Sequence, residues 1–333
     1  MIGLKKTSVI IPTINSILNL NSLIRSLLCQ KNINLRIINV LIIQNNRKYF
    51  EEKIPLNFKK KNLNIKVYNE RKMGLHFARN LGVKMAQTNN LILLDDVIVL
   101  GNYHLSNMIK SLNKNDLIGG PNLIKLQSKI SKWIIKFYFK KIYINQIYCP
   151  FLSYLDLGNK NKVIKPNFIF GMNMGFKRKL FYKLNGFHPD LIGRGYDNIF
   201  IGDGETGFLN KCAKNNTIAF YNYKCKVFHE LPAKRLTKSY FIERSKYHAF
   251  SDSFSILKYN QSLLFVILRL FKKVLKFLYL NTKLIFFAKK SNKLYVNYKL
   301  PMEIQYIKSF IKHHFLFIFD KDLNSWVKKE KYF

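Results

Sequence analysis

The first hundred residues alternate between short apolar runs and segments with helical periodicity. The apolar runs lie at 8–12, 36–43, 65–68 and 91–94; the first is rich in β-branched residues and the last is rich in leucine. Between them, residues 15–29 and 74–86 carry apolar side chains at intervals of three and four, which predicts helices. This alternation predicts an α/β fold with a largely parallel, doubly wound sheet. Right-handed crossovers in such a sheet bring the strand ends at Pro12, Gln44 and Asp95 to one edge.

Two adjacent carboxylates, Asp95 and Asp96, interrupt the last apolar run, LILLDDVIVL at 91–100. Acids are scarce in this chain, which has 18 Asp and Glu against 57 Lys and Arg. Because isolated burial of a charge is costly, these carboxylates must be solvated in a cleft, paired or bound to a cation. Open parallel sheets bind ligands at the carboxyl ends of their strands, so the pair predicts a metal–phosphate site. A β-turn in which the Asp side chains cap the next segment is the alternative.

The charge of the chain is strongly unbalanced, at +39. Such a charge fits nucleic acid, anionic lipid or polyphosphate partners. Lysine, asparagine and isoleucine are abundant everywhere, however, as AT-rich coding would produce, so we interpret most lysines as part of a solvated surface. No nucleic-acid recognition motif occurs, and we expect no nucleic-acid partner.

The remaining composition bears on the location of the protein. The four cysteines are widely spaced and form no CxxC pair, which favours a reducing compartment without structural zinc. No uncharged run reaches the roughly 18 residues that a spanning helix needs, and the apolar start is too short for a signal peptide. We expect a cytoplasmic protein, peripheral on the inner face of the cell membrane if it contacts lipid. Residues 123–150 predict an amphipathic helix or an edge hairpin. Residues 262–287 predict an amphipathic helix that packs on the core or on anionic lipid.

Six motifs follow one another in a fixed order. They are SVIIPTIN at 8–15, GLHFARNLGVKMA at 74–86, LLDD at 93–96, GMNMGFKRKLFYKLNGF at 171–187, GDGETGF at 202–208 and VFHE at 227–230. Together they resemble a family 2 glycosyltransferase over roughly residues 7–250. The resemblance implies a GT-A fold over 1–250, with a Rossmann-like, mostly parallel sheet flanked by helices. Residues 251–333 would then form a basic amphipathic helical extension.

The same resemblance implies an activity. Family members of this kind move a sugar, with inversion, from a nucleotide-diphosphate donor to a hydroxyl of a glycan or lipid-linked acceptor, which suggests cell-surface polysaccharide synthesis. The alternative is a non-catalytic member with a degraded metal site that binds a nucleotide-sugar or a glycan.

The resemblance assigns the donor nucleotide to the first two strand ends. It implies that Pro12, Thr13 and Asn15 hold the nucleotide, although Thr13 or Asn15 as a helix cap is an equally compatible interpretation. Gln44 and Asn45 stand where the family usually carries an acid that grips the uridine or ribose. Their neutral amides can still hydrogen-bond a ribose or base, and they leave UDP-, dTDP- and GDP-linked donors open.

Three further residues are implied in donor binding. Arg79 would meet the diphosphate charge and Asn80 would hold the ribose. Asn173, in the glycine-rich GMNMGF segment, would contact hydroxyls of the donor sugar. For Arg79, a solvent-facing position on a surface helix is the alternative.

Asp95 and Asp96 stand where the family carries its Asp-x-Asp motif. Hard oxygen ligands suit Mn²⁺ or Mg²⁺, which would bridge the two phosphates and stabilise the departing nucleoside diphosphate. The sequence departs from the family here, because Val97 or Leu94 replaces one carboxylate of the usual pair. His229 resembles a late histidine that adds a metal contact in some members, and a structural histidine is the alternative.

The loop GDGETGF aligns with the family signature that carries the catalytic base. The alignment puts Glu205 at the base position, with Asp203 as second choice. An inverting transfer needs one carboxylate to take a proton from the acceptor hydroxyl. Acids also favour helix N-termini, so an acidic cap on a helix over 208–212 is compatible with the same residues.

Overall fold

The computed structural model describes residues 5–55, 58, 63–126, 129–143, 146–190, 202–259, isolated positions between 264 and 279, and 294–332. The chain divides into two compact units. The first comprises residues 1–125, 140–231 and 330–333, and the second comprises 126–139 and 232–329. Residue 250, the predicted boundary between a catalytic domain and an extension, lies inside helix α7 (Lys238–Lys258). A domain division at that residue stays a prediction.

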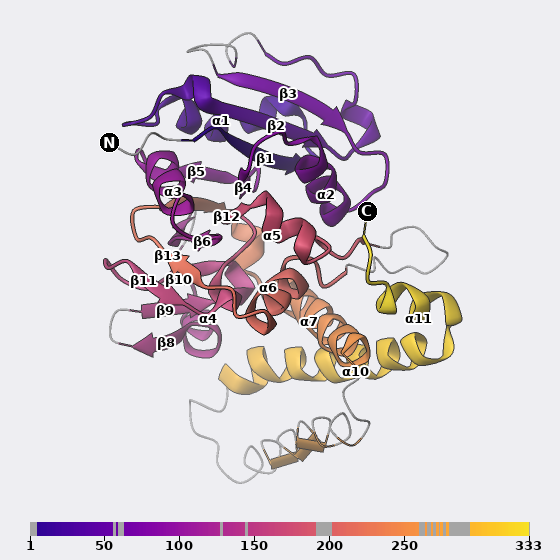
Figure 1. The fold of residues 1–333 in the computed structure, drawn as a ribbon. Helices are drawn as coiled ribbons and strands as arrows, with labels where there is room; N and C mark the ends of the chain where they lie inside the picture. Colours follow the sequence, from indigo (N-terminus) through magenta and orange to yellow (C-terminus); the bar gives the residue numbers. More distant parts are fainter. Residues whose placement is uncertain are drawn as a thin grey trace. The chain divides into compact units, whose positions relative to one another are not determined.

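The first unit is built on an eight-stranded sheet with the order β11-β13-β6-β12-β4-β1-β2-β3 (Figure 1). The strands are β1 (Thr7–Thr13), β2 (Ile38–Gln44), β3 (Asn64–Asn69), β4 (Asn90–Leu94), β6 (Leu117–Gly119), β11 (Lys162–Ile164), β12 (Asn173–Lys177) and β13 (Ala219–Tyr221). Strands β4, β1, β2 and β3 run parallel, while β12 is antiparallel to both β4 and β6. All four predicted strands are present, and the predicted α/β class is confirmed.

Helices cover both faces of this sheet. They are α1 (Asn21–Leu28), α2 (Leu75–Met85), α3 (His104–Leu112), α5 (Arg178–Lys183) and α6 (Gly204–Lys214). Side chains alternate across a strand, so neighbours on β1 enter different layers. Val9 and Ile11 pack with residues of α1 and α3, whereas Ile10 packs with residues of α2, α5 and α6. The apolar layers on the two faces hold the carboxyl ends of the parallel strands in fixed positions.

A second sheet of six strands has the order β5-β14-β7-β10-β9-β8. Its strands are β5 (Ile98–Leu100), β7 (Asn122–Leu126), β8 (Lys140–Tyr143), β9 (Gln146–Cys149), β10 (Tyr154–Asp156) and β14 (Val227–Leu231). The segment 123–150 contains both predicted alternatives, because helix α4 (Lys132–Tyr138) precedes the hairpin of β8 and β9. The run LILLDDVIVL therefore supplies a strand to each sheet, with the acid pair at the turn between β4 and β5.

The second unit is helical and confirms the predicted C-terminal helical extension. It contains α4, α7, α10 (Leu300–Phe319) and α11 (Lys321–Lys328). Trp133 of α4 packs edge-on against Phe241 of α7, with ring centroids 4.9 Å apart, and stacks on Tyr298 at 4.7 Å. None of the described helices combines the length and the apolar stretch that a membrane crossing requires. The helix predicted over 262–287 lies outside the described residues except at isolated positions.

Candidate active site

The carboxyl ends of β1, β2 and β4 lie side by side, as the sequence predicted. Thr13 pairs with Gln44 in the β1–β2 ladder, and β4 ends at Leu94, directly before the acid pair. Pro12 is buried on β1 opposite Ile43. The polar residues that follow these strands therefore meet at one edge of the sheet.

Asp96 is fixed by two residues that follow β1. Its Oδ2 accepts a hydrogen bond from Thr13 Oγ1 at 2.7 Å and one from Asn15 Nδ2 at 2.9 Å. Neither Thr13 nor Asn15 caps the next helix, since the capping side chain there is Ser16. The two side chains instead orient a carboxylate at the strand edge.

Arg79 is the central cation of the site. Only 1% of it is exposed, so a solvent-facing position is ruled out. Its Nη1 donates to Oε2 of Glu205 at 2.5 Å, and its Nη2 donates to Oδ1 of Asp95 at 3.1 Å. Helix α2 thereby links the acid pair to the acid of the GDGETGF loop. Arg79, Asp95 and Glu205, called the charge triad below, come from three separate motifs of the sequence.

Burial and charge act in opposite directions within the charge triad. Burial alone would raise the pKa of Glu205, but the charge of Arg79, the charge of His76 and hydrogen bonds from Arg79 and the Gly171 N–H lower it overall. Burial raises the pKa of Asp95, and the nearby charges of Glu205 and Asp96 add to this effect, while Arg79 opposes it. Glu205 is therefore ionised at neutral pH, and one arginine pairs with two carboxylates, Glu205 and Asp95.

The glycine at position 171 allows this close packing. A methyl group in place of its hydrogen would overlap Glu205 Oε2 and would lie 2.7 Å from Arg79 Nη2. Only glycine leaves room for the backbone beside the charge triad. The first glycine of GMNMGF is thus explained by an acid that lies 34 positions later in the printed sequence.

Gln44 and Asn45 have their amides engaged with the surrounding backbone. Gln44 Nε2 donates to the carbonyl of Asn15 at 2.9 Å. Asn45 Nδ2 donates to the carbonyls of Glu70 and Lys72, and its Oδ1 accepts from the Gly74 N–H at 2.8 Å. Both side chains are buried and shape the loops around the strand ends. Their contact with a nucleotide stays a prediction.

Asn80 and Asn173 do not join the charge triad. Asn80 exchanges two hydrogen bonds with the backbone of Phe187, at 2.8 and 3.1 Å. Asn173 is 1% exposed. Its Oδ1 lies 2.8 Å from His104 Nε2, and its Nδ2 donates to the carbonyl of Cys225 at 2.9 Å. These contacts hold helices and strands together, and the donor-binding roles of both residues stay predictions.

The two candidate bases lie at the start of the same helix and have different neighbours. Asp203 precedes α6, and its carboxylate packs against Gly207, where a methyl group would overlap it. Glu205, two residues later, reaches Arg79 instead. The geometry therefore favours Glu205 over Asp203 as the acid that faces the strand edge.

The predicted metal ligands fit a divalent cation only in part. The carboxylate oxygens of Asp95 and Asp96 are the hard donors that Mn²⁺ or Mg²⁺ prefers. His229, the third candidate, lies on β14 opposite Ile98 of β5, just past the acid pair. Within the described part of the chain, no group of three His, Cys, Asp or Glu side chains is arranged to hold a metal ion. Metal binding by Asp95, Asp96 and His229 stays a prediction.

Sequence reasoning missed two residues beside the site. His76 Nδ1 lies 2.7 Å from Asp190 Oδ1, and both residues are buried. They are 114 positions apart, and no spacing rule connects them. The only available signal was the presence of His76 within the GLHFARN motif that also carries Arg79.

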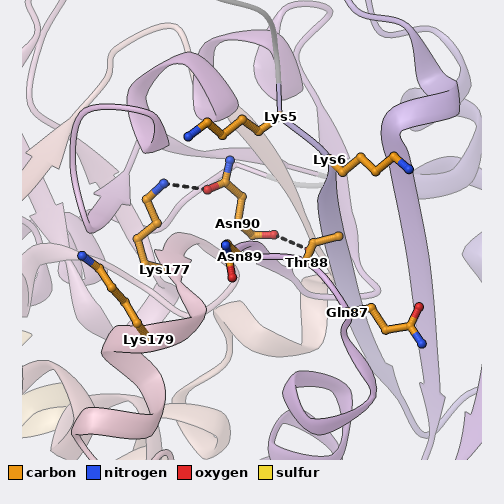
Figure 2. A pocket seen from close by; sticks show the side chains of 8 residues that line it. All are labelled: Lys5, Lys6, Gln87, Thr88, Asn89, Asn90, Lys177 and Lys179. Atoms are coloured by element: carbon orange, nitrogen blue, oxygen red, sulfur yellow. Dashed lines mark hydrogen bonds between the residues drawn. The ribbon is translucent and has the colours of Figure 1, made fainter.

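A pocket of about 610 Å³ lies away from the charge triad, and Figure 2 shows the side chains that line it. It is lined by Lys5, Lys6, Gln87, Thr88, Asn89, Asn90, Lys177 and Lys179. Thr7 pairs with Asn90, so these residues sit at the amino ends of β1 and β4. Asp95 and Asp96 follow the carboxyl end of β4, so the pocket is at the opposite edge of the sheet.

The sequence and the fold were compared with known proteins. The family model described as "Glycosyl transferase family 2" matches residues 8–184, more than half of the chain. A search of curated proteins found no match.

Several solved structures are similar in fold. One is the mannosyltransferase PcManGT from Pyrobaculum calidifontis, in complex with GDP-Man and Mn²⁺, at 14% identity and a TM-score of 0.55. The similarity covers 96% of this chain and 89% of that chain. Another is GalNAc-T7 with UDP, GalNAc and Mn²⁺, at 17% identity and a TM-score of 0.50, with 69% of this chain and 45% of that chain covered.

The first 349 residues of TarS from S. aureus, in complex with UDP, are 15% identical, with a TM-score of 0.43. The match covers 74% of this chain and spans 65% of that one. Identities this low show the fold alone. That fold is the GT-A fold, as the motif order predicted.

Proposed function

The chain belongs to glycosyl transferase family 2, and we propose that it transfers a sugar, with inversion, from a nucleotide-diphosphate donor to a hydroxyl of a glycan or lipid-linked acceptor. It is a glycosyltransferase with a GT-A fold. Cell-surface polysaccharide synthesis is the proposed setting for this reaction. The observation that carries the proposal is the charge triad at the carboxyl edge of the sheet.

Glu205 is the proposed general base. Its lowered pKa keeps the carboxylate ionised at neutral pH, which a proton acceptor requires. It would take the proton of the acceptor hydroxyl as that oxygen attacks the anomeric carbon from the face opposite the leaving nucleoside diphosphate. The Nη1 bond of Arg79 fixes the direction of the carboxylate and lowers its basicity. A diphosphate that draws Arg79 toward itself would weaken this bond and make Glu205 a stronger base.

The donor diphosphate is proposed to lie against Arg79, Asp95 and Asp96. Arg79 provides the positive charge, and Thr13 and Asn15 orient Asp96 through their hydrogen bonds. Asp95 and Asp96 would hold Mn²⁺ or Mg²⁺ together with phosphate oxygens. The cation, when bound, would neutralise charge on the departing nucleoside diphosphate. The solved structure of PcManGT, which is similar in fold, is a complex with GDP-Man and Mn²⁺, and this supports a nucleotide-sugar donor and a divalent cation for this chain.

A panel of nucleotide-sugars with Mn²⁺, followed by mass spectrometry of the released nucleotide, tests the activity. We expect one donor to be hydrolysed slowly and to be consumed faster with an acceptor. The variant Glu205→Gln should lose transfer by about 10²- to 10⁴-fold and retain nucleoside-diphosphate binding. Full transfer activity in Glu205→Gln would contradict the assigned base. Nucleotide binding without turnover, unchanged when the metal is removed, would instead favour the non-catalytic alternative.

A lipid-linked acceptor would be met at an anionic membrane surface, and the second unit carries apolar side chains suited to one. On α10, Ile311, Phe315 and Ile318 lie on one face and are 42%, 58% and 42% exposed. The described residues before α10 repeat the pattern. Apolar side chains there follow a spacing of four and three and are 46% to 65% exposed: Leu264, Leu268, Phe271, Leu275 and Leu278. Interspersed lysines would add attraction to anionic lipid.

Sedimentation with vesicles tests this peripheral location. The protein should pellet with vesicles that contain anionic lipid and stay in solution with neutral ones. Phe315→Ser combined with Ile311→Ser should weaken the binding, whereas Leu126→Ser, a change at another exposed apolar position, should leave it unchanged. Equal binding by the double variant would contradict the role of α10.

A further inference from the structure

A buried pair of ionisable side chains lies at the start of helix α6, behind the proposed base. The carboxylate of Asp190 accepts from His76 through Nδ1 at 2.7 Å and through the backbone N–H at 3.0 Å. It also accepts from the Gly202 N–H at 3.1 Å. His76 and Asp190 are 5% and 3% exposed. Burial alone would raise the pKa of Asp190, but the charge of His76 and these hydrogen bonds lower it.

The bond to Asp190 fixes the orientation of the imidazole. An ionised carboxylate only accepts hydrogen bonds, so Nδ1 carries the proton. The opposite edge of the ring then faces Gly204. A methyl group at Gly204 would overlap Nε2 and Cε1 of His76, and Gly204 also has a positive φ of 44°. The ring therefore rests on the first residue of α6, next to Glu205.

We propose that His76, fixed by Asp190, is a positioning residue for Glu205. The ring holds the first turn of α6 at the place from which Glu205 reaches Arg79. This inference rests on the proposed function, because it assumes that Glu205 is the base. The charged and titratable groups that act on Glu205 are Arg79 and His76 on α2 and Asp95 after β4. Tyr148 on β9 is also nearby: burial raises the pKa of its hydroxyl, and the charge of Glu205 raises it to a smaller extent.

A purely structural role for His76 is the competing interpretation. It would tie α2 to the segment that contains Phe187 and Asp190. That segment, however, is already tied to α2 by Asn80, which exchanges two hydrogen bonds with the backbone of Phe187. Beyond this tie, the ring of His76 also lies against Gly204. The His76–Asp190 pair therefore constrains the position of α6, which the hydrogen bonds between Asn80 and Phe187 do not do.

The variant His76→Asn separates these two roles. The Asn amide can replace Nδ1 as the donor to Asp190, but it has no ring edge to rest on Gly204. We expect kcat to fall about tenfold to a hundredfold, since small misplacements of reacting groups cost rates of this order. The KM for the donor should stay within about threefold, because only the position of the base changes. Gly204→Ala, which displaces the ring from the other side, should have the same effect.

A double-mutant cycle with Glu205→Gln provides the decisive comparison. If His76 acts through Glu205, His76→Asn should cause no further loss of transfer in the Glu205→Gln background. Asn222→Ala is the matched control, because it removes a buried hydrogen bond to Ser111 in the same unit, and its effect should be equal in both backgrounds.

Two outcomes would overturn the inference. One is full kcat in both His76→Asn and Gly204→Ala while Glu205→Gln is inactive. The other is an equal loss from His76→Asn with and without Glu205→Gln. Full activity of Glu205→Gln itself would overturn the proposed base, so the failure of the proposed function can be told apart from the failure of this inference.

Discussion

Replacing Arg79 with methionine should expose how strongly the site depends on one cation. Methionine is similar in length and fills much of the same space, but it brings neither charge nor donors. The replacement leaves Asp95 and Glu205 next to each other without the guanidinium that joins them at 3.1 and 2.5 Å. The folded protein must then either hold two adjacent carboxylates or bind protons.

The size of the effect follows from burial. Removing one partner of a fully buried ion pair costs about 3–5 kcal/mol. The side chains of Asp95 and Glu205 are 32% and 30% exposed, while Arg79 is 1% exposed. Water reaches the carboxylates in part, so we expect the free energy of unfolding to fall by about 2–4 kcal/mol at neutral pH.

The loss should depend on pH with a definite sign. In the native protein the folded pKa of Glu205 is lowered. Its stabilising contribution is therefore present above the unfolded pKa of about 4.3 and is lost as the pH falls through the folded value. Without Arg79, burial and mutual repulsion raise the pKa of Glu205 and raise that of Asp95 further. Both acids then destabilise the fold at neutral pH, and this penalty disappears as they bind protons. The native protein and Arg79→Met should therefore differ less in their free energy of unfolding as the pH falls toward about 4.

Thermal and urea unfolding followed by far-UV circular dichroism between neutral pH and about pH 4 would measure this difference. Tryptophan fluorescence would report on the other unit, since Trp133 and Trp326 are the only two tryptophans and both lie there. Lys125→Met is the control. It breaks an exposed pair with Glu230 whose side chains are 67% and 41% exposed, which should change stability by less than about 1 kcal/mol. If Arg79→Met were no more destabilising than this control, or if its effect did not vary with pH, the reasoning about the charge triad would be refuted.

Three further changes test neighbouring parts of the site. Asp96→Asn should weaken Mn²⁺-dependent binding of a nucleoside diphosphate by about tenfold or more and leave metal-free binding unchanged. Calorimetry with and without Mn²⁺ measures the two affinities. An equal loss of affinity under both conditions would contradict a role of Asp96 in metal binding. Gly171→Ala should lower stability by about 1–3 kcal/mol through overlap with Glu205, and an unchanged urea midpoint would argue against that contact. His104 has a pKa lowered to about 4 by burial, so stability that is present above its ordinary value of 6.5 should be lost as the pH falls toward 4. His104→Gln should lose less stability over that range.

The parts of this molecule that the sequence predicted correctly are those whose signal is local. The runs that became β1, β2 and β4 are buried on both faces. The run that became β3 lies at the edge of the sheet, where Ile65 and Val67 are partly buried. Sheet topology then brings the carboxyl ends of parallel strands to one edge, and the acid pair, Thr13 and Gln44 lie there. Of the second sheet, the sequence predicted only a hairpin within 123–150, which corresponds to β8 and β9. The other strands gave no signal, because strands such as β5 and β10 have three residues each. So short a segment has no periodicity to recognise.

The contacts that define the site join residues far apart in the chain, and sequence periodicity does not record them. Arg79 illustrates this limit. Its position on α2 is compatible with a solvent-facing side chain, and only the arrival of α6 on the same face of the sheet buries it between two acids. The His76–Asp190 contact spans 114 positions, and no spacing in the sequence connects its two residues.

The glycines of the motifs do reflect these contacts, but the reason for each glycine can be identified only once the fold is known. Gly171 and Gly204 look in the sequence like generic flexible positions. In the structure each occupies a place where a side chain from another segment fills the space that a Cβ would need: Glu205 beside Gly171, and His76 beside Gly204. The glycine in each motif therefore marks where a side chain from a distant segment approaches the backbone, and Gly204 directly precedes Glu205. A search for further site residues in this chain should begin from what lies against its glycines, since these side chains escape the periodicity that reveals the strands.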